Sequence, residues 1–429
     1  MHLHQALLAV SVLAVAVSQS APSSPNHSPP SNAPTGFTLG PATRQSNLFK
    51  VCAISDTPAD VGPSILKAAK DCNNGGTVYF PAGKTYTIAT SLDLTFLKNI
   101  SFAILGRIVF SDDIGIWPGQ TFDYPFQGAS MFWRFGGSNV SIFGLGKGVI
   151  DGLGQKYWTA MKTDPNVKRP ILFGTDGLHR AVISGLTMKN PPGWFNLYTN
   201  STDLLITDMK LIVESADSNF PAKNTDGFDT YRSSRIVLQN SVVRNTDDCV
   251  SFKPNTTEMT VQNLDCTGSH GISVGSFGQY QNEIDIVENL LIHNVTLRNG
   301  SDAARIKVWP GVPAGTVNSE SGGGGGMVRN VKYHRVRSYN NENSLALTQC
   351  YGVKDQAFCN ANPNIEFVDF AGVTGKKYDP RAGYLTCSSP AVCKNIRARN
   401  INFSVPSNKT VTYQCVNVDR SLLELNCIN

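Results

Sequence analysis

The hexapeptide Leu290-Leu-Ile-His-Asn-Val295 has apolar residues at its first, third and sixth positions and Asn at its fifth. Alternation with a period of two residues is typical of a β-strand that buries one face. Asn, Asp and Gly tolerate a sharp backbone bend better than other residues do. The hexapeptide therefore predicts a short buried strand that ends in a bend.

Copies of this unit recur along the chain, with successive copies 23 to 41 residues apart. They begin at Val140, Ala181, Leu204, Ile236 (a looser match), Met259, Leu290, Val331, Ile365 and Ile396. Recurrence at this interval indicates stacked coils, because one coil is too small to bury its apolar face alone. The repeat therefore predicts an all-β fold, a single-stranded right-handed parallel β-helix. An antiparallel β-sandwich fits less well, because it needs hairpins about every 8–12 residues and the chain has too few turn pairs such as Asn-Gly.

One short helix is expected before the repeats, over residues 60–72. Pro63 suits its first turn, where the missing N–H costs nothing. Helical spacing predicts a single apolar face, made of Ile65, Ala68, Ala69 and Cys72. We expect this helix to cap the open end of the coils, because an uncapped coil exposes unpaired backbone groups. A turn over 73–76 and a strand over 77–80 should follow.

Composition divides the chain into three segments. Residues 1–20 resemble a signal peptide, with a short apolar run followed by small residues. Residues 21–48 are rich in Ser and Pro and predicted to be flexible, and residues 49–429 are predicted to form the β-helix domain. The net charge of +5 lacks the basic block that nucleic-acid binders show, and no later segment reaches the roughly 18 apolar residues of a membrane span. We therefore expect a secreted, extracellular monomer with no nucleic-acid or membrane partner.

The cysteine count and the glycosylation motifs fit an oxidising compartment. Ten Cys is an even number, and short loops favour three pairs without fixing the connectivity: Cys249 with Cys266, Cys387 with Cys393, and Cys415 with Cys427. Nine Asn-x-Ser/Thr motifs are candidates for N-glycosylation. They lie at Asn26, Asn99, Asn139, Asn200, Asn255, Asn294, Asn299, Asn402 and Asn408.

Four polar islands interrupt the strands in the middle of the chain. They are Asn224-Thr-Asp-Gly227, Asp247-Asp248, Ser269-His-Gly271 and Arg305-Ile-Lys307. The first three are separated by 21 and 22 residues, about one coil, so their side chains should stack on adjacent rungs ~4.8 Å apart. Carboxylates held this close cannot all ionise easily, so at least one pKa should rise, as a general acid working beside a general base requires. Each island alone could be a turn or a solvated loop; the ordered set favours a catalytic site.

These islands resemble the signatures of glycoside hydrolase family 28, the polygalacturonase family. The matching stretches are Asn224-Thr-Asp-Gly-Phe-Asp229, Asp247-Asp-Cys249, His270-Gly-Ile-Ser-Val-Gly275 and Arg305-Ile-Lys307. Longer segments, 248–255, 269–280 and 304–311, look most similar to fungal exopolygalacturonases. The resemblance runs from about Phe49 to the C-terminus. It implies a pectin-lyase-like β-helix that cleaves α-1,4-galacturonosyl linkages of the acidic polysaccharide pectin with inversion, releasing galacturonic acid from chain ends.

The resemblance also implies roles for individual residues. Asp247 matches the general acid, and Asp226 and Asp248 match the pair that activates the attacking water. His270 matches the imidazole that supports protonation of the acid. The residues that match substrate-binding positions are Arg305, Lys307, Tyr351 and Asn224. Many family members have Gly before the histidine, whereas this chain has Ser269, as the exo-acting fungal group does. Asn245 and Thr246 precede the Asp pair where Gly is common in that group. Neither departure removes a reacting group, and Thr246 is expected to affect the shape of the loop.

The sequence indicates no cofactor and no metal site, since Gly322 to Gly326 lacks the Lys-Ser/Thr of a phosphate-binding loop. Exo action would need walls that close one end of the site, and residues 117–133 and 319–327 are the candidates. Several alternatives stay open: an endo-polygalacturonase, a hydrolase of xylogalacturonan or rhamnogalacturonan, a calcium-dependent lyase, and a non-catalytic polysaccharide-binding β-helix.

Overall fold

A computed structural model describes residues 50–352, 359, 363–406 and 409–429, all within one compact unit that spans 42–429. The predicted signal peptide (1–20) and Ser/Pro-rich segment (21–48) lie outside the described residues, as do the candidate glycosylation sites Asn26 and Asn408. Within the part of the chain that is described, no helix is long and apolar enough to cross a membrane.

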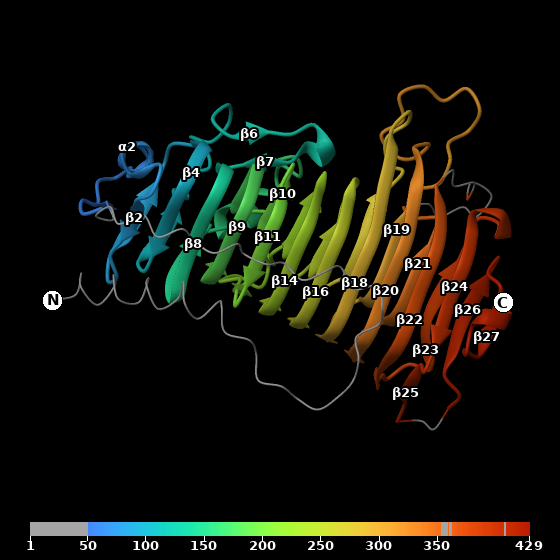
Figure 1. The fold of residues 1–429 in the computed structure, drawn as a ribbon. Coiled ribbons are helices and arrows are strands. Elements are labelled where there is room, and N and C mark those ends of the chain that lie inside the picture. Colours follow the sequence, from blue (N-terminus) through green and yellow to red (C-terminus); the bar gives the residue numbers. More distant parts are fainter. Residues whose placement is uncertain (1–49, 353–358, 360–362, 407–408) are drawn as a thin grey trace. The chain divides into compact units, whose positions relative to one another are not determined.

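Parallel strands dominate the described residues, and twenty-five of them join one continuous sheet (Figure 1). The N-terminal half contains β1 (Val51–Ala53), β2 (Thr77–Phe80), β3 (Thr85–Ile88), β4 (Leu92–Ile104), β5 (Arg107–Phe110), β8 (Trp133–Asp151), β9 (Phe173–Lys189), β10 (Asn196–Thr199), β11 (Thr202–Thr207) and β12 (Lys210–Ile212). The middle contains β13 (Phe228–Tyr231), β14 (Ser233–Arg244), β15 (Val250–Phe252), β16 (Thr256–Thr267), β17 (Ile272–Phe277), β18 (Ile284–Arg298) and β19 (Asp302–Val308). The C-terminal part contains β20 (Gly325–Tyr339), β21 (Asn343–Thr348), β22 (Asn364–Lys376), β23 (Arg381–Thr386), β24 (Cys393–Arg399), β25 (Asn402–Ser404), β26 (Thr412–Val416) and β27 (Cys427–Ile428).

The remaining elements are short. A separate antiparallel pair joins β6 (Phe122–Asp123) to β7 (Ser130–Met131). The helices are α2 (Gly62–Cys72), α3 (Gln155–Ala160) and the single 3₁₀ turns η1 (Phe126–Gly128), η3 (Pro390–Val392) and η4 (Arg420–Leu422). Successive coils lie side by side from β1 to β27, so the predicted right-handed parallel β-helix is confirmed.

Rows of buried side chains run through the coils and form the core. The first position of each predicted unit aligns with that of the next, for example Leu204 with Ile236, Ile236 with Met259, and Met259 with Leu290. These side chains are at most 2% exposed. A stack of this kind removes apolar surface from water along the whole helix, which no single coil could do.

One predicted unit is out of phase. Register aligns Val331 with Val368, not with Ile365, so the unit there is Val368-Asp-Phe-Ala-Gly-Val373. Ile365, Val368 and Phe370 are all buried, whereas Phe367, the third residue of the predicted unit, is 54% exposed. The correct phase puts Gly372, with φ of 65°, at the bend.

The fifth position of the unit adopts the left-handed backbone conformation that the sequence suggested. It does so in eight of the nine units, at Gly185, Asp208, Asn240, Asn263, Asn294, Arg335, Gly372 and Asn400. In the unit that begins at Val140, the sixth residue, Leu145, adopts this conformation instead. Asn has a second function here, because Asn263 donates to Asn240 at 3.0 Å and Asn294 donates to Asn263 at 2.7 Å. This side-chain ladder joins three successive bends, and it explains why Asn is preferred there over Gly.

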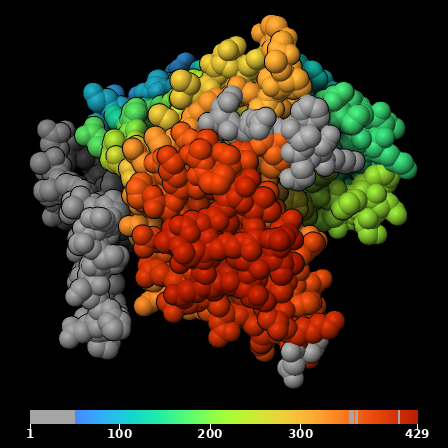
Figure 2. Space-filling model, turned by 90° about the vertical axis from the view of Figure 1, so that its right-hand side faces the viewer, coloured from blue at the N-terminus to red at the C-terminus, as the bar shows by residue number. Residues whose placement is uncertain are grey.

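Both ends of the stack are covered. Helix α2 buries Ile65, Ala68, Ala69 and Cys72, which is the predicted face, and it contacts β1, β2 and β4. At the other end, Leu423, which directly follows η4, pairs with Ala398, and the C-terminal residues fill the end face seen in Figure 2. The caps shield backbone groups that the terminal coils would otherwise expose.

Five disulfides cross-link the chain, and they include the three pairs that the short loops predicted. The pairs are Cys52–Cys72, Cys249–Cys266, Cys350–Cys359, Cys387–Cys393 and Cys415–Cys427. The described glycosylation candidates are exposed or half-buried and remain predictions: Asn99, Asn139, Asn200, Asn255, Asn294, Asn299 and Asn402.

Candidate active site

The predicted catalytic residues lie at the starts of three successive strands. Phe228, Val250 and Ile272 align across β13, β15 and β17. Counting back two residues in each coil places Asp226, Asp248 and His270 at equivalent positions on adjacent rungs. The sequence had paired Asp226 with Asp247, which is one residue off the register, so Asp247 lies on the turn beside this row.

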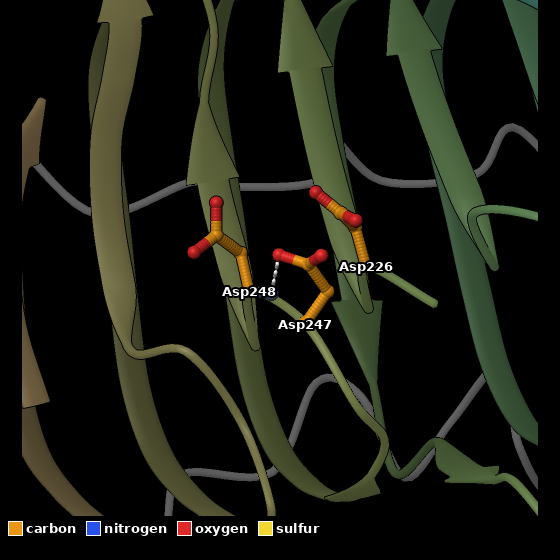
Figure 3. A group of neighbouring side chains, drawn as sticks. All are labelled: Asp226, Asp247 and Asp248. Atoms are coloured by element: carbon orange, nitrogen blue, oxygen red, sulfur yellow. Dashed lines mark hydrogen bonds between the residues drawn. The ribbon is translucent and has the colours of Figure 1, made fainter. Parts of the chain in front are cut away.

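The three carboxylates converge at one place, as Figure 3 shows. One oxygen of each lies within 4.8 Å of one oxygen of both others. Asp226 and Asp248 are at most 4% exposed, whereas Asp247 is half-buried. The Asp248 amide donates to Asp247 Oδ1 at 2.9 Å, which fixes the turn between them.

Two glycines let the rungs approach this closely. A Cβ on Gly227 would lie 2.4 Å from the carbonyl oxygen of Cys249 on the next coil. Gly271 has φ of 114°, and a Cβ there would lie 2.9 Å from the carbonyl oxygen of Ala303. Any larger residue would push apart the rungs that carry Asp226, Asp248 and His270.

Asp248 is held by three donors on later coils. Lys307 Nζ lies 2.6 Å from Oδ2, and the Ser273 hydroxyl donates to Oδ1 at 2.6 Å. Arg305 Nη1 lies 3.7 Å from Oδ1. Lys307 is only 5% exposed, so its ammonium group interacts mainly with Asp248 and little with solvent. This pairing gives Asp248 a fixed orientation and a compensated negative charge.

Asp247 has different partners, at the open side of the site. His270 Nδ1 lies 3.1 Å from Asp247 Oδ1, and the Asn224 amide donates to Asp247 Oδ2 at 3.3 Å. Asn224 is itself oriented by Arg169, which donates to its Oδ1 at 2.8 Å. Arg169 was not predicted from the sequence, because it lies two coils earlier, in the loop before β9.

The pKa directions separate the carboxylates. Burial raises the pKa of Asp226 well above its ordinary value, and the nearby Asp247 charge raises it further. Burial also opposes ionisation of Asp247 and is the largest single effect, but the hydrogen bond and charge of His270, the charge of Lys307 and the Asp248 backbone N–H together outweigh it and lower the pKa of Asp247. The same hydrogen bond raises the pKa of His270. The expected rise in one pKa therefore occurs at Asp226, while the proton beside Asp247 is carried by His270.

Beneath Asp226 lies a pair that the sequence reasoning did not assign. Lys253 Nζ is 3.5 Å from Asp226 Oδ2 and 3.5 Å from Asp229 Oδ2. The ammonium also lies 4.7 Å from the centre of the Trp194 ring. Both Lys253 and Asp229 fall within quoted motifs, but alternation along a strand does not show which charged side chain becomes buried.

The cations and the predicted aromatic residue meet on β19 and β21. Arg305 Nε pairs with Asp302 Oδ2 at 3.1 Å, and its side chain is 16% exposed. Tyr351 lies just after β21, with its ring 5.8 Å from the Arg305 guanidinium and 5.6 Å from Lys307 Nζ. Trp309 packs edge-on against Tyr351 at 5.3 Å. The structure thus brings both predicted cations and Tyr351 together beside Asp248.

The residues that depart from the family pattern form a polar support under the catalytic turn. The Asn245 amide donates to the carbonyl oxygens of Asp247 and Asp248, each at 2.9 Å. Ser269 donates to Asn245 Oδ1 at 2.6 Å. The Thr246 hydroxyl contacts that of Thr225 at 2.9 Å. These bonds hold the Asp247-Asp248 turn where a glycine would offer no side chain.

A rim of three loops borders the site at the far ends of the strands. The loop between β6 and β7 reaches the loop after β17, where the Gln127 N–H donates to the Tyr280 hydroxyl at 2.8 Å and Gln127 Nε2 donates to Gln279 Oε1 at 2.9 Å. The loop before β20 joins them, because the Gly322 N–H donates to the Gln279 carbonyl at 2.7 Å. Both predicted walls therefore belong to one connected rim, although Trp117 and Trp133 themselves are core residues.

A cavity of about 620 Å³ adjoins this rim. Gln127 and Ala129 of the rim line it, together with Lys168, Arg169, Trp194 and Asn224. Asn224 connects the cavity to Asp247. It is a basic and aromatic pocket one coil before the carboxylates, a suitable place for an anionic sugar unit.

Among the described residues, these three carboxylates are also close enough together to bind one metal ion. However, Lys307 already contacts Asp248, and Lys253 lies beside Asp226. Two resident ammonium groups supply the positive charge that a cation would bring. This charge arrangement favours acid–base chemistry.

The fold and site define a β-helical hydrolase of acidic polysaccharide, with paired carboxylates and cations on one face. The profile of glycosyl hydrolases family 28 matches residues 76–426, and the chain belongs to this family. It is 55% identical over 424 residues to "Exopolygalacturonase A" of Aspergillus niger, covering 97% of each chain. It is 48% identical to "Probable exopolygalacturonase X" of Aspergillus terreus, covering 85% of this chain and 84% of the relative.

Among solved structures, the chain resembles an endo-xylogalacturonan hydrolase from Aspergillus tubingensis. The TM-score is 0.77 and the sequence identity 32%, with 89% of this chain and 99% of that chain covered. The relatives therefore include both an exo-acting group and an enzyme named for a decorated polymer.

Proposed function

We propose that the protein is a secreted exopolygalacturonase, which hydrolyses α-1,4-galacturonosyl linkages of pectin and releases galacturonic acid from chain ends. The observation that carries this proposal is the convergence of Asp226, Asp247 and Asp248 within 4.8 Å beside Arg305 and Lys307. Carboxylates supply the acid and base of glycoside hydrolysis, and cations orient a uronate substrate. The relatives named exopolygalacturonase support the exo mode.

Asp247 is the proposed general acid. The leaving glycosidic oxygen takes a proton from Asp247 as its bond to the anomeric carbon breaks. His270, 3.1 Å away, carries the proton that replenishes Asp247, because its pKa is raised while that of Asp247 is lowered. The hydrogen-bonded pair thus acts as one proton donor, which is how a carboxyl of low pKa can serve as an acid.

Asp226 and Asp248 are proposed to activate the attacking water. Both oxygens of Asp248 accept hydrogen bonds, from Lys307 and Ser273, so its role is to orient the water. Asp226 has the raised pKa and accepts the proton that the water loses. One oxygen each of Asp226, Asp247 and Asp248 lie within 4.8 Å of one another, whereas the acid and base carboxyl groups of inverting enzymes are typically roughly 6.5–9.5 Å apart. Because the space is small, Asp226 and Asp248 are proposed to share one water.

The substrate carboxylate is proposed to bind Arg305. This residue is the more exposed of the two predicted cations, at 16% against 7% for the Lys307 side chain. A guanidinium can form two parallel hydrogen bonds to a carboxylate. Tyr351 supports the sugar from the side, and the cavity next to Asn224 receives the unit on the other side of the scissile bond.

A hydrolase of xylogalacturonan is the second candidate, favoured by the similarity to the Aspergillus tubingensis enzyme. The test compares the products formed from polygalacturonate and from xylogalacturonan over time. Galacturonic acid as the first soluble product from polygalacturonate supports the proposal. Early mixed oligomers would contradict exo action, and cleavage of xylogalacturonan alone would favour the second candidate.

A further inference from the structure

A buried ionic group lies directly behind the catalytic carboxylates, and the proposed mechanism has not used all of it. Asp229 is 0% exposed, and neither of its oxygens has a hydrogen-bond partner among the described residues. Its neighbour is Lys253, at 3.5 Å and 4% exposed. Leaving a buried carboxylate without hydrogen bonds is costly, so its retention needs an explanation.

The charges of this buried group do not balance. It contains three carboxylates, Asp226, Asp229 and Asp248, and two ammonium groups, Lys253 and Lys307, none more than 5% exposed. Arg305 lies 3.7 Å from Asp248, but its charge is paired with Asp302 at 3.1 Å. Because an uncompensated charge in the interior is unfavourable, one carboxylate must hold a proton. Lys307 lies 2.6 Å from Asp248 and compensates its negative charge. The proton therefore belongs to Asp226 or Asp229.

Lys253 has the same distance of 3.5 Å to both of these carboxylates. Burial raises the pKa of Asp229 to about 7, and burial raises the pKa of Asp226 well above its ordinary value. One ammonium is thus placed to pair with whichever carboxylate is ionised. The Trp194 ring, 4.7 Å from Lys253 Nζ, closes the third side and excludes water.

We propose that Asp229 and Lys253 are positioning residues for the hydrolysis: Asp226 and Asp229 share one buried proton, and Lys253 pairs with whichever of the two is ionised, so that Asp226 can face the water as a base. This inference rests on the proposed function of Asp226 as the base. It explains why a second carboxylate, Asp229, is buried beside Asp226 with Lys253 as its neighbour. It also explains how a carboxylate as buried as Asp226 can be ionised when the substrate arrives.

The proposal predicts opposite pH shifts for two substitutions. Lys253→Met removes the cation that lowers the pKa of Asp226, so the acid limb of the kcat/KM profile should move up by about one pH unit or more. Its kcat should fall about 10-fold with little change in KM. Asp229→Asn removes a negative charge that raises the pKa of Asp226, so the acid limb should move down. The amide resembles the protonated carboxyl, so kcat should stay within about threefold of the parent.

The profile depends on every charged group that faces Asp226. These are Asp229, Asp247, Asp248, Lys253 and Arg169, and only the first and fourth are changed. Thr230→Val is the matched control, since Thr230 is buried on the same strand and contacts Thr256 rather than the charged group. Its acid limb should coincide with that of the parent.

Carboxyl ¹³C NMR of aspartate-labelled protein gives a second readout that does not need activity. The Asp226 resonance, assigned with Asp226→Asn, should titrate at higher pH in Lys253→Met and at lower pH in Asp229→Asn. Equal or unchanged titrations in the two variants would overturn the proposal, as would parallel shifts of both acid limbs. A parent protein that hydrolyses no polygalacturonate would refute the proposed function, while the NMR titration still decides the role of the pair. If Lys253→Met does not fold, Asp229→Asn and the parent titration carry the test.

Discussion

The floor and the rim of the site are built in different ways. The floor consists of the starts of β13, β15 and β17, where parallel register alone brings Asp226, Asp248 and His270 together. The rim consists of loops joined by side chains far apart in sequence, such as Gln127 and Tyr280, which are 153 residues apart. The comparison teaches that chemistry here is fixed by the repeat, whereas the choice of substrate depends on contacts that the repeat does not specify.

Substitution of the acid should have the largest effect, and it tests the floor. Asp247→Asn keeps the shape of the side chain but cannot deliver a proton, so kcat on polygalacturonate should fall by about 10²–10⁴-fold. Initial rates of reducing-end release measure this loss. A variant that retains more than about 1% of parental turnover would remove Asp247 from the role of general acid.

The buried ion pair of the floor should be the next most sensitive feature. Lys307→Met leaves the buried Asp248 carboxylate without its closest cation, which should lower the free energy of unfolding by about 3–5 kcal/mol. Urea denaturation followed by circular dichroism measures the change. Lys189→Met is the control, because its partner Glu214 is exposed and such pairs contribute at most about 1 kcal/mol. Equal losses of unfolding free energy in the two variants would mean that the buried Lys307–Asp248 pair stabilises the protein no more than a surface pair does.

A third prediction concerns pH and the pair His270–Asp247. The pKa of His270 is raised by its hydrogen bond to Asp247, so its proton is present at acid pH and lost as pH rises through the raised value. In the parent, this loss should set the alkaline limb of kcat/KM. In His270→Gln the limb should move to lower pH, because a carboxyl group alone then holds the proton. An alkaline limb at the same pH in both proteins would show that another group controls it.

The smallest effect is expected at the rim. Tyr280→Phe removes the acceptor for the Gln127 N–H and should cost about 0.5–1.5 kcal/mol of local stability. We expect kcat to change little and longer oligomers to appear among early products, because the loop between β6 and β7 then opens more readily. Chromatography of products measures the shift. Tyr378→Phe, on a residue 76% exposed, is the control, and identical product patterns would exclude the Tyr280 contact from control of exo action.

The sequence was sufficient for the coils and for most of the floor because both follow from periodicity. Apolar alternation located the strands, and one-coil spacing located the carboxylates. The same logic could not place Lys253, whose burial depends on Trp194 from an earlier coil. It also misplaced the unit at Ile365, because the apolar Phe367 fits the third position of that unit although its side chain is 54% exposed. The rim was foreseen only as two loop regions, because no local pattern encodes contacts between loops.

The bend at the end of each unit has a consequence for how such a protein can diversify. Aligned first positions are 23 residues apart from Ala181 to Leu204 but 41 apart from Val140 to Ala181, yet both pairs keep their register. Residues can therefore be gained or lost between bends without moving the neighbouring coils. The stacked coils form a constant scaffold, and the loops between them can vary in length. New polymer preferences can therefore evolve by changing a loop while the reacting groups stay in place.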